Sequence, residues 1–546
     1  MSPRPGNPSR VAWDCAITMP DLFTFASSSA TSLFAPYRVP LTTAYIAVLS
    51  VVAIYGLHRY FLVWTWRRHH KSVQRPAGRF AQHPRVTVQL PVFNEGQVVQ
   101  RAIDAVCQLE WPRDRFQVQV LDDSTDDSLE LARIRVEYWR ARGVDVVHIH
   151  RTDRTGFKAG ALAHGMDTAS GEFIALFDAD FIPPVNFLKR TIHHFTDPKL
   201  AVVQTRWDHL NREDSALTRA QAMLLDGHFV IEHTARNRSG RWFNFSGTGG
   251  VWRRAAIDDA GGWEHDTLTE DMDLSYRAQL NGWDFRYLPH ITCPAELPPE
   301  VNAFKSQQHR WTKGTVQTML KLLPRILRAK APFKCKLEAV FHLTHPLVYL
   351  LINVFVLLFF PTIAANADQQ STMFGVLFGF TMFGLGALSA GVYYTASQRI
   401  LKKPLLPTLL QMPVLLAVGV GIALSNAIAC MEALLGHRSD FVRTPKYNRT
   451  EAAPRLSAAD THSPGGLARL IPVPSLKRWV VLVEIALGVY LLWCIFQAWG
   501  DLRTALSLPF LFIFAAGYLY VGLSSAWLSI RCWLESREIV ATPEAA

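Results

Sequence analysis

Long apolar stretches at both ends of the chain enclose a charged central block, and this division limits the folds that the chain can adopt. Apolar residues make up 49% of the 546 residues and charged residues 18%, which fits neither a typical soluble protein nor a pure bundle of membrane helices. A stretch of about 20 apolar residues is long enough to cross a lipid bilayer. We therefore expect membrane helices on both sides of a separate polar domain.

The apolar stretches predict five membrane crossings, with the N-terminus outside and the C-terminus inside, because basic residues mark the cytoplasmic ends of the stretches. The expected order is an N-terminal tail (1–40), a transmembrane helix (41–66), a polar domain with interface helices (72–338), two transmembrane helices (339–396), a re-entrant or interfacial helix (405–436), a basic loop and linker (437–478), two transmembrane helices (479–530) and a C-terminal tail (531–546).

The stretch at 405–436 differs from the others because basic residues flank it on both sides. Charge bias therefore places both of its ends in the cytoplasm. Pro407 and Pro413 each remove a backbone donor and weaken the stretch as a straight helix. We interpret it as re-entrant or interfacial, and a complete crossing that breaks the charge rule is the alternative.

Short apolar strands alternate with helices in the central block, a pattern typical of an α/β domain with a mostly parallel sheet. Ligands of such sheets lie beyond the carboxyl ends of the strands. The predicted strands are residues 86–90, 116–121, 144–148 and 173–177, with a helix over 128–142.

The formal net charge of +11 is explained by basic flanks on apolar segments, which face anionic lipid. No compact Lys/Arg run or recognition motif predicts nucleic-acid binding. The seven cysteines are scattered without a CxxC pair, so neither a zinc site nor a disulfide framework is expected.

Acidic residues follow two of the predicted strands, where the sheet rule places a ligand. Asp122 and Asp123 end one strand, and Asp178 and Asp180 follow another. Two carboxylates one residue apart can hold Mg²⁺ or Mn²⁺ on a diphosphate. Such a pair is often only a solvated turn, but the preceding strand is apolar throughout, which favours the cation site.

A second acidic group, Thr269-Glu270-Asp271, opens a predicted helix. Asp271 is the candidate general base that deprotonates an acceptor hydroxyl. An N-cap is the alternative interpretation of Thr269.

Seven motifs, in this order, resemble the processive family-2 glycosyltransferases of the cellulose-synthase superfamily, in particular the cellulose-synthase-like mannan and glucan synthases and their bacterial relatives. The matching stretches are 89–95 (QLPVFNE), 120–126 (VLDDSTD), 155–162 (TGFKAGAL), 177–181 (FDADF), 245–253 (FSGTGGVWR), 269–273 (TEDMD) and 307–311 (QQHRW).

This resemblance implies a GT-A (Rossmann-like) cytoplasmic domain inserted between transmembrane helices. It also implies roles for single residues: Asp123 and Lys158 bind the donor, Asp178 and Asp180 bind the nucleotide diphosphate and the metal, Asp271 with its neighbour Glu270 is catalytic, and Gln307, Arg310 and Trp311 cradle the acceptor and the diphosphate.

A later segment, 441–446 (FVRTPK), resembles the FxVTxK gating loop of cellulose synthases, which implies that Phe441, Thr444 and Lys446 close over the donor. Arg443 stands in the valine position and Pro445 is unusual, and both departures put the gating role in doubt. The alternative is an ordinary basic loop beside the membrane.

The function expected from the resemblance is a membrane-embedded, inverting enzyme that polymerises hexose from UDP-glucose or GDP-mannose. Its product is a β-linked polysaccharide, expected to be β-1,4, made at the cytoplasmic face of the plasma (inner) membrane. The expected partners are the donor, the growing polysaccharide, membrane lipids and accessory export proteins. Two alternatives stay open: transfer of one sugar to a lipid, and a transporter or receptor that only binds a nucleotide sugar.

Overall fold

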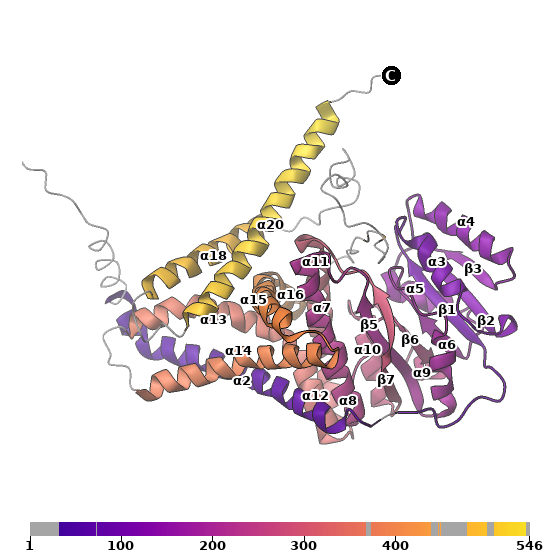
Figure 1. The fold of residues 1–546 in the computed structure, drawn as a ribbon, viewed down its shortest axis with the longest axis horizontal. Coiled ribbons are helices and arrows are strands. Elements are labelled where there is room, and N and C mark those ends of the chain that lie inside the picture. Colours follow the sequence, from indigo (N-terminus) through magenta and orange to yellow (C-terminus); the bar gives the residue numbers. More distant parts are fainter. Residues whose placement is uncertain are drawn as a thin grey trace, which may run out of the picture.

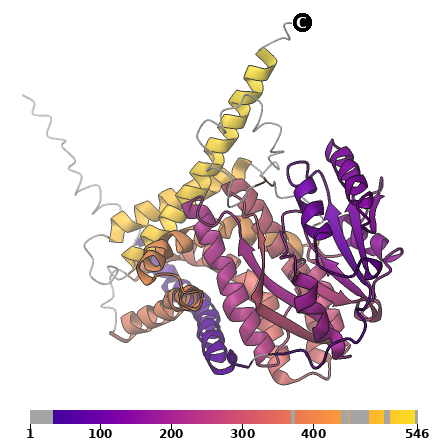
Figure 2. The same cartoon turned by 45° about the vertical axis from the view of Figure 1, so that its right-hand side comes forward.

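The computed structural model describes residues 32–72, 74–366, 373–437, 446, 448, 478–498 and 507–541. An α/β domain lies on one side of the molecule, and long apolar helices gather on the other (Figure 1). Helices α7 (Ala216–Asp226) and α11 (Val301–Arg328) lie between the two parts in both views (Figures 1 and 2).

Among the described residues, the domain is built on a seven-stranded sheet with the order β3-β2-β1-β4-β6-β5-β7. Strand β1 pairs in parallel with β2 and β4, and β2 with β3, so that the carboxyl ends of these four strands meet at one edge. Strand β6 runs antiparallel to β4 and β5. The strands are β1 (Val86–Val92), β2 (Phe116–Asp122), β3 (Val146–His150), β4 (Phe173–Leu176), β5 (Leu200–His209), β6 (Gly250–Arg253) and β7 (Asp284–Ala295).

Two apolar layers cover the faces of the sheet, so that β2 and β4 are buried throughout and β1 almost throughout. Helices α3 (Val99–Cys107), α4 (Ser128–Arg140) and α6 (Phe187–Thr191) supply one layer. Helices α5 (Phe157–Met166), α9 (Arg254–Asp259) and α10 (Glu270–Leu280) supply the other. The predicted fold class, an α/β domain inserted between apolar helices, is confirmed.

Five segments in the described part of the chain are long and apolar enough to cross a membrane: Ser32–His69, Phe333–Ala365, Leu405–Leu434, Trp479–Gln497 and Leu508–Arg531. Leu405–Leu434 is one of them, although the sequence analysis interprets it as re-entrant or interfacial. Helix α14 (Met373–Ile400), which the sequence analysis counts as a crossing, is a further apolar helix of 28 residues. The division into crossings stays a prediction.

The apolar helices pack against one another, and buried residues from the first of them to the last belong to one cluster. Helix α2 (Arg38–His69) contacts α13 (Val348–Ala365) and α14, while α18 (Arg478–Ala498) packs along α20 (Leu508–Ala541). Gly56 allows α2 and α14 to approach closely, because a Cβ at this position would lie 2.5 Å from the carbonyl oxygen of Leu385.

The segment 405–434 forms two helices, α15 (Leu405–Gly421) and α16 (Ala423–Leu434), which meet at Ile422. Helix α15 contacts α7 and α20, and α16 contacts α11 and α13. Met412 and Leu415 pack against Leu217 and Met223 of the α/β domain. Much of this segment therefore lies against the domain.

A buried ionic network joins the first helix to the domain. Arg236 in α8 (Thr234–Arg238) donates a 2.9 Å hydrogen bond to Glu338 in α12 (Phe333–Thr344), and its guanidinium lies 3.4 Å from Glu232. His58 of α2 lies 3.2 Å from the same Glu338 carboxylate. Because both Arg236 and Glu338 are buried, removing either charge takes a close, desolvated partner from the rest of the network.

Candidate active site

A cavity of about 180 Å³ opens at the edge of the sheet where β1, β2 and β4 end. The sequence-predicted residues that line it are Asp123, Lys158, Asp178, Asp180, Glu270, Asp271, Gln307, Arg310, Trp311 and Lys446. Phe441 and Thr444 lie outside the described residues. The fold thus brings residues from five separate motifs, and one residue beyond α16, to one cavity.

Lys158 holds the first carboxylate of the cavity in place. Its Nζ lies 2.6 Å from Asp178 Oδ1, donates a 3.0 Å hydrogen bond to the Gly247 carbonyl oxygen and lies 3.9 Å from Glu270 Oε1. Burial lowers the pKa of Lys158, but the carboxylates of Asp178 and Glu270 outweigh burial and leave the pKa above its ordinary value of 10.5. The ammonium therefore stays charged and couples the Asp178 and Glu270 motifs.

Gly247 is the backbone position that this arrangement requires. Its φ is +78°, and a Cβ would meet Asp271 Oδ2 at 3.0 Å and Lys158 Nζ at 3.5 Å. A side chain here would be strained and would crowd the acidic centre.

Lys446 neutralises the second carboxylate. Its Nζ lies 2.6 Å from Asp180 Oδ2, and the Asp180 side chain is buried. Burial raises the pKa of Asp180 above its ordinary value of 3.8, and the Lys446 ammonium offsets part of this rise. The last residue of the FVRTPK segment thus lies in the cavity, far from Asp180 in sequence.

Asp271 lies in the first turn of α10, beside Glu270. The Met272 backbone N–H donates a 2.8 Å hydrogen bond to its Oδ1. Burial, together with the neighbouring charge of Glu270, raises the pKa of Asp271 from 3.8 to about 7, although Lys158 counteracts the rise. A carboxylate with a pKa near neutrality can accept a proton efficiently, as a general base must.

Asp123 follows β2, and Arg151, at the end of the adjacent strand β3, holds its carboxylate in place. Arg151, which follows β3, donates from Nε to Asp123 Oδ1 at 2.8 Å and from Nη2 to Oδ2 at 2.6 Å. This bidentate pair orients the carboxylate at the cavity wall. Asp122 points elsewhere: it is buried and lies 2.8 Å from His148 Nε2.

Helix α11 carries the QQHRW motif into the cavity and connects it to the apolar helices. Burial lowers the pKa of Arg310, while the nearby carboxylates of Glu270 and Asp178 counteract this effect. Next to it, the ring of Trp311 lies 6.3 Å from that of Trp207, centroid to centroid. Two residues further along α11, Lys313 lies 2.9 Å from Glu432 of α16, and this ion pair connects α11 to the 405–434 segment.

A second cavity of about 330 Å³ meets the first one at Asp271, Gln307 and Trp311, which line both. It extends toward the apolar helices, where residues of α2, α12, α13 and α15 line it, including Tyr55, Tyr349 and Gly419. The acidic centre is therefore continuous with a passage that enters the helical part of the molecule.

Sequence reasoning missed several residues of this site, among them Arg151, Trp207 and Gly247. A signal existed for two of these three. Gly247 belongs to the FSGTGG motif, and Arg151 follows β3 as Asp123 follows β2, so that parallel pairing places them side by side. Trp207 lies in β5, a strand that the sequence analysis did not predict.

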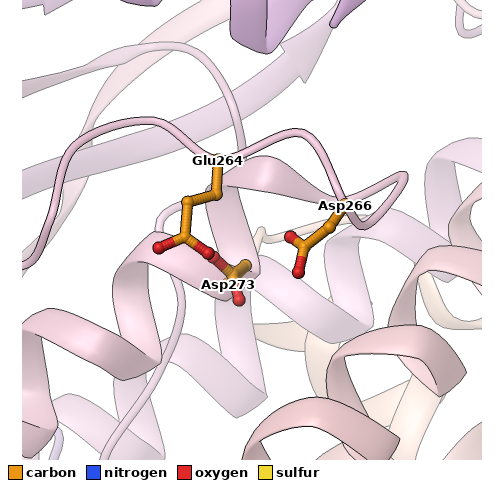
Figure 3. A group of neighbouring side chains, drawn as sticks. All are labelled: Glu264, Asp266 and Asp273. Carbon is orange, nitrogen blue, oxygen red and sulfur yellow. The ribbon is translucent and has the colours of Figure 1, made fainter.

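A different acidic group lies beside α10. Glu264, Asp266 and Asp273 bring one carboxylate oxygen each to within 4.8 Å of one another (Figure 3). The ammonium of Lys321 occupies this group, with its Nζ 2.7 Å from Asp266 and 3.0 Å from Asp273. The ion pairs of Lys321 therefore connect α11 to α10, the helix that carries Asp271.

Three comparisons place the domain among known proteins. Residues 83–314 match the family model described as glycosyltransferase like family 2. "Probable glucomannan 4-beta-mannosyltransferase 6" of Oryza sativa subsp. japonica is 48% identical over 259 residues, 46% of this chain and 45% of the relative. "Glucomannan 4-beta-mannosyltransferase 1" of Cyamopsis tetragonoloba is 40% identical over 317 residues, 55% of this chain and 60% of the relative.

Among solved structures, a mannosyltransferase from Pyrobaculum calidifontis in complex with GDP-Man and Mn²⁺ aligns with a TM-score of 0.49 at 21% identity, covering 71% of this chain and all of that one. The matched region spans about half the length of the curated relatives. Residues 83–314 therefore resemble the glycosyltransferase-like family 2, and segments long and apolar enough to cross a membrane lie on both sides of them.

Proposed function

We propose that the chain is an inverting glycosyltransferase that builds a β-1,4-linked hexose polymer from a nucleotide-sugar donor. The observation that carries this proposal is the environment of Asp271, a half-buried carboxylate with a pKa of about 7 at the junction of the two cavities. The first cavity has the charges that a nucleoside diphosphate needs, and the second has room for an acceptor.

Asp271 acts as the general base in this proposal. It removes the proton of an acceptor hydroxyl while the oxygen attacks the anomeric carbon of an α-linked donor, and the bond to the nucleoside diphosphate breaks. One displacement on the opposite face inverts the configuration and gives a β-linkage. No carboxylate nucleophile takes part, and burial together with the charge of Glu270 keeps the pKa of Asp271 high enough for proton transfer.

Three cations of the chain stabilise the departing diphosphate. Arg310 presents a planar fork of donors to phosphate oxygens, and Lys158 and Lys446 are ammonium groups already at the carboxylates of the cavity. Lys446 already pairs with Asp180, so donor binding and this ion pair involve the same ammonium group.

Asp178 and Asp180 fit a hard divalent cation, because they supply oxygen ligands whose negative charge is at present balanced by two ammonium groups. Mg²⁺ or Mn²⁺, when bound there, neutralises charge on the diphosphate. The chain's own residues do the remaining work: Lys158 holds Asp178, and Gly247 leaves space beside Asp271.

The second cavity favours a polymer over the transfer of one sugar. It begins at Trp311, a flat apolar surface suited to a pyranose face, and continues among α2, α13 and α15. A single acceptor sugar does not require such a passage, whereas a growing chain does. Export of the product along it is part of this proposal.

The names of the relatives favour GDP-mannose over UDP-glucose as the donor, because both relatives are named mannosyltransferases. Asp123, held by Arg151, is the proposed contact for the donor's base.

We also propose that both ends of the 405–434 segment lie on the cytoplasmic side with the domain. Gln398, before the segment, donates a 2.8 Å hydrogen bond to Asp226, and Lys446, after it, pairs with Asp180. Both partners belong to the α/β domain, which cannot lie on two sides of a membrane. A re-entrant or interfacial path satisfies both contacts.

Nucleotide release tests the enzymatic proposal. Purified protein in detergent is incubated with GDP-mannose or UDP-glucose and Mn²⁺, and free nucleotide is measured against the Asp271→Asn variant. We expect release from at least one donor by the wild type and a loss of about 10²–10⁴-fold in the variant. A protein that binds a donor but never releases nucleotide is a receptor or transporter, which would refute the proposal.

A further inference from the structure

A groove of about 660 Å³ lies between α2, α14 and α15, separate from the two cavities of the catalytic site. Its lining is mainly apolar and includes Val63, Leu388, Val392, Leu409 and Met412. Leu388 is 61% exposed and Leu409 48%, so the groove is open to the surroundings of the helices. In a membrane protein, those surroundings are lipid.

Two arginines, Arg67 and Arg399, are the charged residues of this groove. Helices α2 and α14 run in parallel, because Gly56 lies against Leu385 and Val63 packs with Tyr393. Both arginines therefore lie at the same end of their helices, next to the α/β domain. Within the described part of the chain, no carboxylate lines the groove and neither guanidinium has an ion pair.

We propose that this groove binds one anionic phospholipid of the surrounding membrane, with its phosphate at Arg67 and Arg399 and an acyl chain along Leu388, Val392 and Leu409. A guanidinium fork matches phosphate oxygens in geometry and charge. Basic pockets between membrane helices on the cytoplasmic side have the chemistry for anionic headgroups. A zwitterionic lipid fits less well, because its cationic group meets two arginines.

Gly391 leaves the space for the acyl chain. It lines the groove, and a Cβ added there meets no heavy atom within 4 Å. A leucine at this position therefore occupies the groove without a clash at its Cβ, and it is a better helix former than glycine. This substitution blocks the proposed site while it leaves the helix intact.

The proposed lipid also supports the corner between α14 and α15. Helix α15 contacts α7 of the domain, and Gln398, next to Arg399, is bonded to Asp226. A lipid in the groove therefore stabilises the position of α15, the start of the segment that leads to Lys446. This consequence rests on the proposed function, whereas lipid binding itself does not.

Native mass spectrometry of the purified full-length protein tests the inference. Delipidated protein is titrated with phosphatidylglycerol and with phosphatidylcholine of the same acyl chains. We expect one phosphatidylglycerol to bind about tenfold more tightly than phosphatidylcholine, since the anion gains charge-assisted hydrogen bonds. The Arg67→Gln/Arg399→Gln double variant should lose this preference, and Gly391→Leu should weaken binding of phosphatidylglycerol with the arginines intact.

Arg68→Gln is the matched control, because Arg68 lies next to Arg67 but stacks on Trp64, 5.7 Å from its ring centroid, and does not line the groove. It should bind phosphatidylglycerol as the wild type does. Equal binding of the two lipids by the wild type overturns the proposal. So does a double variant that keeps the preference, or inorganic phosphate that displaces the lipid, because the acyl chain would then contribute nothing.

Discussion

Replacing Asp271 with asparagine separates what this carboxylate contributes to turnover from what it costs in stability. Asparagine keeps the size of the side chain but cannot take up a proton at neutral pH. Turnover should therefore fall by about 10²–10⁴-fold, the usual contribution of a general base. Donor binding should change little, because Lys158, Arg310 and Asp123 remain in the cavity.

The same substitution should stabilise the fold at neutral and alkaline pH. The pKa of Asp271 is raised from 3.8 to about 7, and each pKa unit corresponds to about 1.4 kcal/mol. The folded state keeps its proton between these two pH values while the unfolded state loses it, so stability falls as pH rises through this window. Above pH 7 the ionised carboxylate costs at most about 4 kcal/mol, and neutral asparagine avoids this cost.

Two assays on the same preparations check both expectations: nucleotide release, and thermal unfolding in detergent followed by intrinsic fluorescence from pH 5 to pH 8. The unfolding temperature of Asp271→Asn should exceed that of the wild type by a margin that widens toward pH 8. Asp258→Asn, which alters an exposed carboxylate of α9, is the control and should change neither quantity. Near-normal turnover of Asp271→Asn removes this residue as the base, and a margin that does not depend on pH refutes the electrostatic argument.

The remaining predictions address the metal, the buried network and the topology. Activity should require Mg²⁺ or Mn²⁺ and vanish in EDTA, and Asp180→Ala should be inactive even at high metal concentration; full activity in chelator would mean that the paired carboxylates serve another purpose. Arg236→Met should lower the free energy of unfolding by about 3–5 kcal/mol, because Glu232 and Glu338 lose the buried cation that lies nearest to both, and chemical denaturation measures this loss. Cysteines placed at the exposed Lys403 and Asn448, one on each side of the 405–434 segment, should both react with an impermeant label only from the cytoplasmic side, whereas labelling from opposite sides would show a complete crossing.

The sequence predicts the first half of the sheet well, because β4 is a continuous apolar run and β1 and β2 alternate apolar residues with Thr or Gln. The later strands gave no such signal. Strand β6 has four residues and is held by antiparallel partners on both sides, and β7 has alternating burial with two prolines in it. Their formation depends on tertiary pairing that no local pattern encodes.

In the candidate site, local motifs likewise predict single residues, whereas the contacts between distant segments depend on the whole fold. Asp178, Asp180 and Asp271 follow from motifs at strand and helix ends, where sheet topology gathers ligands. The pairing of Lys446 with Asp180 could not be derived in this way, because it depends on how α15 and α16 fold back along the domain. Motifs indicate which residues share a cavity, but the contacts among them require the packing of the whole chain.

Product analysis tests the central proposal most directly. Membranes that contain the protein are incubated with labelled GDP-mannose and, in parallel, with labelled UDP-glucose, and linkage analysis identifies the high-mass product. The account predicts a 4-linked β-mannan from GDP-mannose that is absent in membranes containing Asp271→Asn. A lipid that carries a single sugar, or a product whose amount does not depend on Asp271, would contradict it.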